Sequence, residues 1–134
     1  MLFAEAFNDR ARFDALWSWT QANLDVLDSG LLAWRYQPDQ TPPVQDLNNA
    51  SDGDLLIAWA LHRAAYKWRE TEYEHLSIRL RQAIQRHLFR DYGGYALLLP
   101  ARDGFVRGDR VIVNLSYWVM PALREFANVD PGGP

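Results

Sequence analysis

The sequence predicts a mostly α-helical fold with an inner and an outer layer of helices. Apolar residues recur at helical spacing over three long segments. One of them, residues 53–68, is apolar almost all the way round, which is typical of a helix buried on every side. The next, residues 72–89, has a single apolar side, as an outer helix would. Long loops and one short β-hairpin complete the prediction.

The composition fits one domain and excludes several kinds of site. The 134 residues are 49% hydrophobic and carry a net charge of −3, so we expect a packed core and no broad surface for nucleic acid or anionic membrane. The absence of cysteine excludes disulfides and thiolate chemistry. No two histidines have the spacing of a helical metal site, so we predict neither metal nor cofactor.

Two targeting features are also missing from the sequence. No apolar run reaches the ~20 residues of a membrane span. The first ten residues have neither the basic start nor the apolar stretch of a signal peptide.

Four helices are expected from the apolar spacing and the residues that can cap them. Asn8 or Asp9 can begin the first helix, and Pro121 is tolerated in the first turn of the last. The expected ranges are about 9–23, 53–68, 72–89 and 118–127.

The segments between these helices carry glycine and proline. Residues 25–50 predict a long irregular loop, and loops of that length are often functional. Residues 95–99 and 110–113 read as two short strands, and the turn residues Asp103-Gly104 and Gly108-Asp109 lie between them. We therefore expect the two strands to pair as the hairpin.

The start of the buried helix, "NNASDGDLLIAWAL", places two carboxylates beside a glycine. Ser51 with Asp54 three residues on is similar to a capping box. Asp52 and Asp54 both suit the positive end of the helix dipole. Two readings follow: either both acids only cap the helix, or one caps it while the other faces a ligand.

Aromatic residues are the unusual part of the composition, with six tryptophans. Tryptophan suits stacking on sugar rings or bases, and core packing is the alternative. Trp34 lies in the long loop, and Tyr117 lies in "NLSYW", where a loop meets the last helix. "NNASD" precedes the buried helix in the same way. If these two helices are inner helices that run parallel, the loops at their starts open on one face and form a cleft for a sugar or polyol.

The residues from Ala50 to Trp68 resemble the signature of glycoside hydrolase family 8. That signature has Ala, Ser or Thr, Asp, Gly or Ala, and Asp, followed by Ile or Met, Ala, and small or aliphatic residues. His62 departs from it, because an aliphatic residue or Gly is usual there. "LLAWRY", "YALLLP" and "VNLSYWVMPALREFA" also resemble family segments in the expected order, with Leu115 in place of a proline. The similarity is to the endoglucanases associated with bacterial cellulose synthesis.

The resemblance implies a fold and a reaction. The fold would be part of an (α/α)6 barrel. The reaction would be hydrolysis of β-1,4-glucan with inversion, in which one carboxylic acid protonates the leaving oxygen and a second carboxylate activates water.

Three site residues are implied by the same resemblance. Asp52 matches the signature acid that contacts the sugar at the cleavage subsite. Tyr117 matches a tyrosine near the nucleophilic water, and Trp34 matches an aromatic platform of the glucan cleft. Asp54 is expected to remain a cap.

The resemblance also implies a central fragment of the catalytic domain. Met1 matches a methionine that follows the general-acid Glu, and the general-base Asp is expected beyond Pro134. We therefore expect an inactive chain of a periplasmic or secreted enzyme, with uncovered helix faces that favour self-association. A non-catalytic β-glucan-binding helical module and a purely structural helical scaffold are the alternatives.

Overall fold

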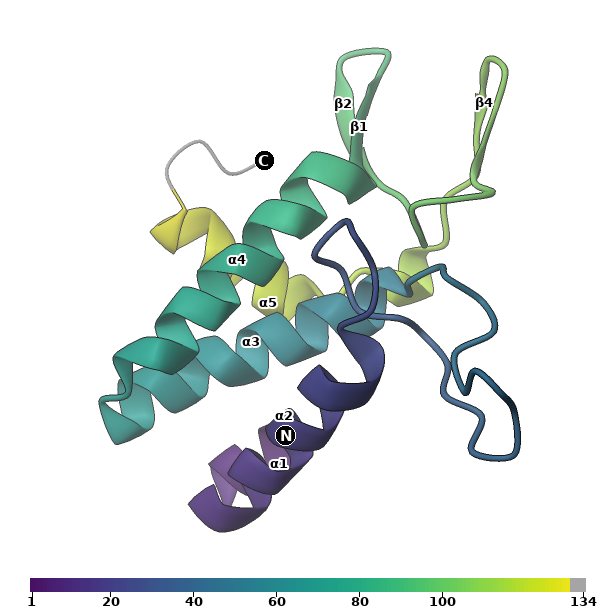
Figure 1. Ribbon diagram of the computed structural model, residues 1–134. Coiled ribbons are helices and arrows are strands. Elements are labelled where there is room, and N and C mark those ends of the chain that lie inside the picture. The colour runs from purple at the N-terminus through teal and green to yellow at the C-terminus, as the bar shows by residue number, and fades with distance from the viewer. Residues whose placement is uncertain (131–134) are drawn as a thin grey trace.

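The computed structural model describes residues 1–130, in which helices dominate (Figure 1). The helices are α1 (Leu2–Ala6), α2 (Arg10–Leu24), α3 (Ser51–Trp68), α4 (Thr71–Leu88) and α5 (Met120–Val129), with a 3-10 turn, η1 (Leu115–Tyr117), before α5. The strands are β1 (Phe89–Tyr92), β2 (Tyr95–Leu98), β3 (Val106–Arg107) and β4 (Arg110–Val111). The mostly helical fold class is confirmed.

Helix α3 is the central element and packs against α1, α4, α5 and η1 (Figure 1). Its small side chains, such as Ala58, Ala60 and Ala64, are fully buried, and small residues allow neighbouring helices to approach closely. One side of α3 is nevertheless uncovered: Tyr66 is 90% exposed. The prediction that this helix is buried on every side is therefore wrong for that side, where no described element packs over it.

The core consists of two clusters that meet at Ile57 of α3. The first joins buried residues of the long loop to α3, the second half of α4, β2 and α5. The second joins α1, α2, the second half of α3 and the start of α4. At roughly 1.5–3 kcal/mol for each fully buried large apolar side chain, these clusters hold the helices together.

Helix α2 begins as its sequence predicts. Asp9 is the N-cap, and its side chain accepts a hydrogen bond from the backbone N–H of Arg12 at 3.0 Å. Such a bond satisfies one of the free N–H groups at the helix start.

The predicted pairing of residues 95–99 with 110–113 is wrong, because two separate hairpins form instead. Strand β1 pairs with β2, and β3 pairs with β4. Gly93 and Gly94 both adopt positive φ, as a two-residue hairpin turn requires. The chain therefore folds back at once onto the strand that follows α4, before residues 110–113 are reached.

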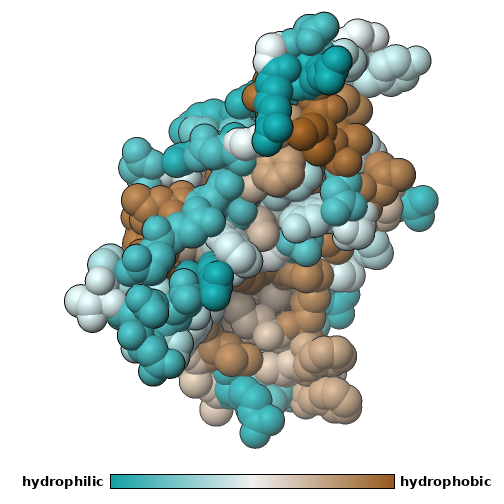
Figure 2. Space-filling view, turned by 90° about the vertical axis from the view of Figure 1, so that its right-hand side faces the viewer, coloured by the Kyte–Doolittle hydropathy of each residue, from teal (hydrophilic) through white to brown (hydrophobic). Residues whose placement is uncertain are grey.

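The starts of α3 and α5 lie at the same end of the molecule, together with the long loop and both hairpins (Figure 1). Helix α5 begins at Met120, later than predicted, because Asn114 caps η1 and the Trp118 N–H bonds back to Leu115. Residues 25–50 form an irregular loop, as expected, tied together by a bridge between Ala33 and Asn49. Figure 2 views this end, where hydrophobic patches lie between hydrophilic side chains.

Candidate functional site

Asp52 lies in the first turn of α3, partly exposed at the loop end of the molecule. Its Oδ1 accepts a hydrogen bond from the backbone N–H of Gly53 at 2.8 Å. Within residues 1–130, no ion pair neutralises it. A side chain at Gly53 would meet no atom within 4 Å, so the helix surface next to Asp52 is open to solvent at that residue. Asp52 is therefore available to a ligand.

Asp54 and Ser51 do not cap α3, which corrects the sequence prediction for both. The N-cap position belongs to Ala50, and no side chain caps the helix there. Ser51 is the first helical residue; its hydroxyl is buried and has no hydrogen-bond partner among the residues that the structure describes. The reason is that the chain enters α3 with the Ser51 N–H already bonded to the carbonyl of Pro100, at 2.9 Å.

The Asp54 carboxylate instead reaches into the long loop. It is 1% exposed. Its Oδ1 accepts from the Leu32 N–H at 2.9 Å, and its Oδ2 accepts from Nδ2 of Asn49 at 2.7 Å. Both oxygens therefore hold loop atoms that are 22 and five residues away in the chain.

Burial raises the pKa of Asp54 to about 7. Desolvation of the charged form is the largest cause, and the nearby Asp52 charge acts in the same direction. The hydrogen bonds from Leu32 and Asn49 act in the opposite direction, because they favour the ionised form. Desolvation outweighs them.

Asn49 extends this contact to a third segment. It is buried, and its Oδ1 accepts from the Arg102 N–H at 2.7 Å. The neighbouring Asn48 bonds both the backbone carbonyl and the backbone N–H of Asp103, at 3.1 and 3.3 Å. Segments 31–34, 46–49 and 100–103 thus converge on the first turn of α3.

Trp34 stands on this loop with half of its surface exposed. Its backbone N–H bonds to the carbonyl of Asn48 at 3.1 Å, and its Nε1 donates to Oδ2 of Asp46 at 2.9 Å. The Arg35 guanidinium lies 5.7 Å from the ring centroid. The indole is therefore both oriented and accessible, which are the two properties that a stacking platform needs.

Tyr117 closes η1 and is partly exposed. Helix η1 packs against α3. Its turn is stabilised by the Asn114 side chain, which accepts from the N–H of Ser116 at 3.1 Å. The loop that carries Tyr117 therefore lies at the same end as Asp52 and the Trp34 loop (Figure 1).

The structure thus gathers the elements of all three predicted site residues at one end of α3. Sequence reasoning missed the residues that arrange them, namely Asp46, Asn49 and the inward role of Asp54. Spacing along the chain carries no signal for these contacts, because each depends on how the long loop folds back.

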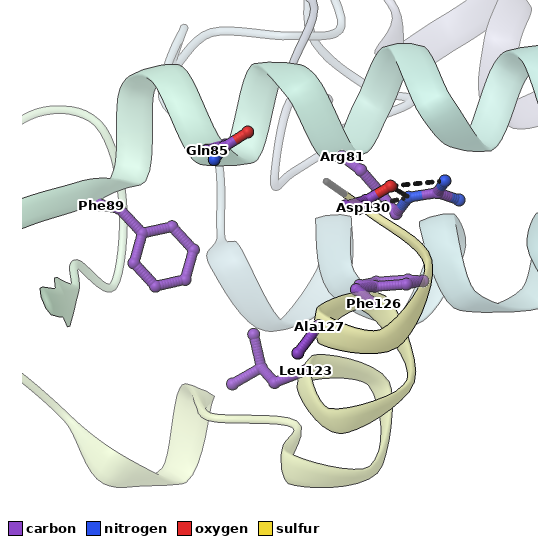
Figure 3. Close-up of a pocket in the computed structure, with 7 residues that line it drawn as sticks. All are labelled: Arg81, Gln85, Phe89, Leu123, Phe126, Ala127 and Asp130. Carbon is purple, nitrogen blue, oxygen red and sulfur yellow. Dashed lines mark hydrogen bonds and ion pairs between the residues drawn. The ribbon is translucent and has the colours of Figure 1, made fainter. Parts of the chain in front are cut away.

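One pocket away from this end of the molecule is too small for a sugar ring. The pocket between α4 and α5 in Figure 3 has a volume of about 40 Å³, which is room for a few waters at most. Phe89, Leu123 and Phe126 lie along it, and the Arg81–Asp130 ion pair stands at one end.

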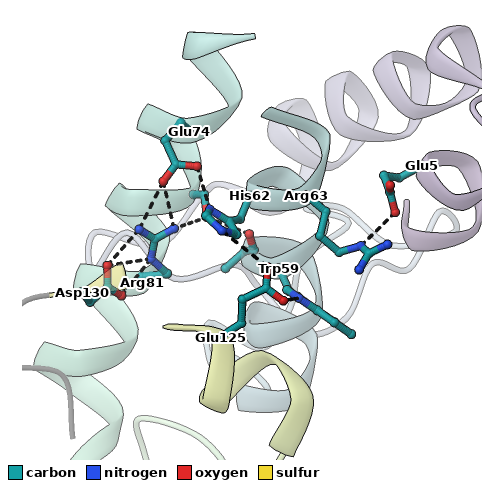
Figure 4. Close-up of polar contacts among 10 residues, drawn as sticks. Glu5, Trp59, His62, Arg63, Glu74, Arg81, Glu125 and Asp130 are labelled. Atoms are coloured by element: carbon teal, nitrogen blue, oxygen red, sulfur yellow. Dashed lines mark hydrogen bonds and ion pairs between the residues drawn. The ribbon is translucent and has the colours of Figure 1, made fainter. Parts of the chain in front are cut away.

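A chain of polar contacts joins α1, α3, α4 and α5 (Figure 4). His62 lies 2.8 Å from Glu74 and 3.5 Å from Glu125, and the Arg63 guanidinium donates to Glu5 at 2.9 Å. These groups satisfy one another and hold helices together. Residues 1–130 contain no group of three or more side chains that could hold a metal ion, and no helix among them is long and apolar enough to cross a membrane.

Comparison with known proteins assigns the chain to a family. The sequence model of the family "Glycosyl hydrolases family 8" matches residues 1–131. The endoglucanase of Cellulomonas uda is 42% identical over 127 residues, which are 95% of this chain and 35% of that protein. The probable endoglucanase of Novacetimonas hansenii is 41% identical over 92% of this chain and 36% of that protein. The chain therefore spans about a third of the length of these relatives.

The fold agrees with a solved structure of the same family. A family 8 endo-β-1,4-glucanase from an Achatina fulica gut metagenomic library superposes with a TM-score of 0.92 at 41% identity, covering 96% of this chain and 41% of that one. The helical architecture is therefore part of the family's (α/α)6 barrel. The chain belongs to glycosyl hydrolase family 8.

Proposed function

We propose that this chain forms part of the glucan-binding cleft of an inverting endo-β-1,4-glucanase. The observation that carries the proposal is the partly exposed Asp52 at the start of α3, with the oriented indole of Trp34 on the loop that packs against this helix start. Relatives at about 40% identity are named endoglucanases, and this end of the molecule offers a carboxylate and an accessible aromatic face.

Each of the three residues has a distinct role in the proposed cleft. Trp34 offers a flat apolar face on which a glucose ring stacks. Asp52 accepts hydrogen bonds from the sugar hydroxyls at the cleavage subsite and helps to hold a distorted ring. Tyr117 lies near the attacking water.

Inverting hydrolysis needs two further carboxyl groups, roughly 6.5–9.5 Å apart, one as general acid and one as general base. Asp54 suits neither role, because it is buried and both of its oxygens are engaged by the loop. We therefore expect the 134-residue chain by itself to bind cello-oligosaccharides without cleaving them.

Calorimetry with cellohexaose tests the cleft. We expect Asp52→Ala to weaken binding about tenfold or more, since a hydrogen bond to a charged group contributes about 1.5–3 kcal/mol. Trp34→Ala should weaken binding by about tenfold. Asp39→Ala, an exposed carboxylate elsewhere in the loop, is the control and should bind as the unsubstituted chain does. Equal affinity of all four proteins would refute the proposed cleft.

A reducing-sugar assay on carboxymethylcellulose separates the two ways in which the cleft could be used. Turnover by the purified chain would contradict our expectation of binding without cleavage. Binding without turnover also fits the second candidate, a non-catalytic β-glucan-binding module, which the same aromatic loop favours. The two candidates differ in whether a longer protein that contains this chain hydrolyses glucan.

We further propose that the protein acts outside the cytoplasm, in the periplasm or secreted. Cellulose is an insoluble polymer that cannot enter the cytoplasm, so an enzyme that cleaves it must act outside the cytoplasm. Cell fractionation followed by immunodetection of the chain tests this placement, and recovery in the cytoplasmic fraction alone would contradict it.

A further inference from the structure

We propose that Asp54 is a positioning residue that sets Trp34 relative to Asp52 for a bound glucan. This inference rests on the proposed function, because it names the group that arranges the proposed cleft. Its basis is the set of hydrogen bonds around Asp54, which we call the Asp54 latch: Asp54, Asn49 and the backbone N–H groups of Leu32 and Arg102.

The latch determines which way Asp52 faces. Two residues along an α-helix are separated by about 200° around its axis. With Asp54 held inward by two hydrogen bonds, Asp52 must point to nearly the opposite side of the first turn, away from the loop anchor. A rotation of this turn would expose one acid and bury the other.

The latch also places the loop that carries Trp34. Leu32 is two residues before Trp34, and the Trp34 N–H bonds to the carbonyl of Asn48, next to Asn49. Trp34 is therefore connected to the latch in two ways: along the chain through Leu32, and across the Ala33–Asn49 bridge through Asn48. A loop of this length would otherwise sample many positions, and the affinity of a stacking platform depends on its being held in place.

The donors and acceptors of the latch are matched one to one. The ionised Asp54 carboxylate accepts twice, and Asn49 donates to Asp54 while it accepts from Arg102. In Asp54→Asn the new amide donates toward the Asn49 amide. Flipping Asn49 removes that clash but aims its NH₂ at the Arg102 N–H, so one donor stays unmatched in either orientation.

Exchanging the two side chains restores the pattern. In the double variant Asn49→Asp with Asp54→Asn, residue 54 accepts from Leu32 and donates to residue 49. Residue 49 still accepts from Arg102. The exchange conserves net charge and volume, so it isolates hydrogen-bond matching from other effects of the substitution.

The experiment has two readouts on the 134-residue chain, both above about pH 8, where Asp54 is ionised and accepts from both donors: amide hydrogen exchange at Leu32 and Arg102 without ligand, and calorimetry with cellohexaose. Asp54→Asn should speed exchange at both amides and weaken cellohexaose binding about tenfold or more. The exchanged double variant should recover most of the amide protection and most of the cellohexaose affinity. Asp39→Asn, with the same charge change on the exposed part of the loop, should leave both unchanged.

The outcomes are distinct. If Asp54→Asn speeds exchange but binds cellohexaose normally, or if the double variant stays as weak as the single one, the positioning role is refuted. If the unsubstituted chain does not bind cellohexaose, the proposed function fails, while the exchange rates still decide whether the latch holds the loop. If Asp54→Asn does not fold, Asn49→Ala, which removes one of the two donors, replaces it, and unchanged exchange and binding in that variant would overturn the proposal.

Discussion

At the scale of single residues, Asp54 is the group whose environment differs most from its sequence prediction. Its spacing from Ser51 predicts a solvent-exposed helix cap, whereas in the structure it is buried and both of its oxygens accept hydrogen bonds from the long loop. Burial raises its pKa to about 7, well above the ordinary value near 3.9. The consequence is a specific dependence of stability on pH.

Between about pH 4 and pH 7, folded Asp54 binds a proton that the unfolded chain lacks. The free energy of unfolding therefore falls as the pH rises through this range, by about 4 kcal/mol in total from this group. We expect Asp54→Asn to remove that slope. Urea unfolding of the unsubstituted chain and of Asp54→Asn at several pH values checks this. Subtracting one free energy of unfolding from the other at each pH cancels the contribution of the other titrating groups. Parallel pH profiles for the two proteins would show that Asp54 titrates normally.

At the scale of elements, Arg81 joins α4 to α5. Its side chain is 5% exposed, pairs with Asp130 at 2.9 Å, and donates to the Ser77 hydroxyl at 2.7 Å. Its guanidinium also lies 5.1 Å from the ring centroid of Phe126 (Figure 4 shows the ion pair). Ser77 in turn donates to the carbonyl of Ala58 in α3, so a single cation connects three helices.

We expect Arg81→Ala to lower the free energy of unfolding by about 2–3 kcal/mol. Breaking a buried ion pair costs about 3–5 kcal/mol, and the estimate is lower here because Asp130 is 30% exposed and partly solvated. Arg79→Ala removes an exposed cation from the same helix and should stay within about 0.5 kcal/mol. Denaturant unfolding of the three proteins measures these free energies. Equal losses of stability in both variants would mean that the contacts of Arg81 contribute nothing specific.

At the scale of the whole molecule, helices α1 and α3 leave large apolar side chains uncovered within residues 1–130. Phe3 and Phe7 are each 83% exposed, and Tyr66 is 90% exposed. A hollow of about 490 Å³ beside Tyr66 is lined by residues of α1, α3 and α5. Exposed apolar surface of this kind marks either an interface or a tendency to aggregate.

Self-association of the isolated chain therefore remains our prediction. Sedimentation velocity over a hundredfold concentration range should show the mean mass rising with concentration. Phe3→Ser together with Phe7→Ser should reduce that rise, whereas Asp39→Asn should not. A monomer at every concentration, with a cooperative thermal melt, would count against it.

The amino-acid sequence was enough to predict the four longest helices, their order and the family, but neither the short α1 nor η1. Helical periodicity and capping residues are local properties, so the 3.6-residue pattern of 53–68 and the cap at Asp9 could be read directly. The signature from Ala50 onward placed Asp52 in a candidate site for the same reason, because the residues that define it are contiguous.

The role of the second acid and the closure of the long loop depend on contacts between distant segments. Asp54 bonds a residue 22 positions away, and Trp34 is oriented by Asp46, 12 positions away, across an irregular loop. The predicted pairing of 95–99 with 110–113 is a different kind of error, because Gly93 and Gly94 form a two-residue turn that the sequence does carry as a local hairpin signal. Contacts between distant segments depend on how the whole chain packs, and no local pattern encodes which buried donor meets which acceptor.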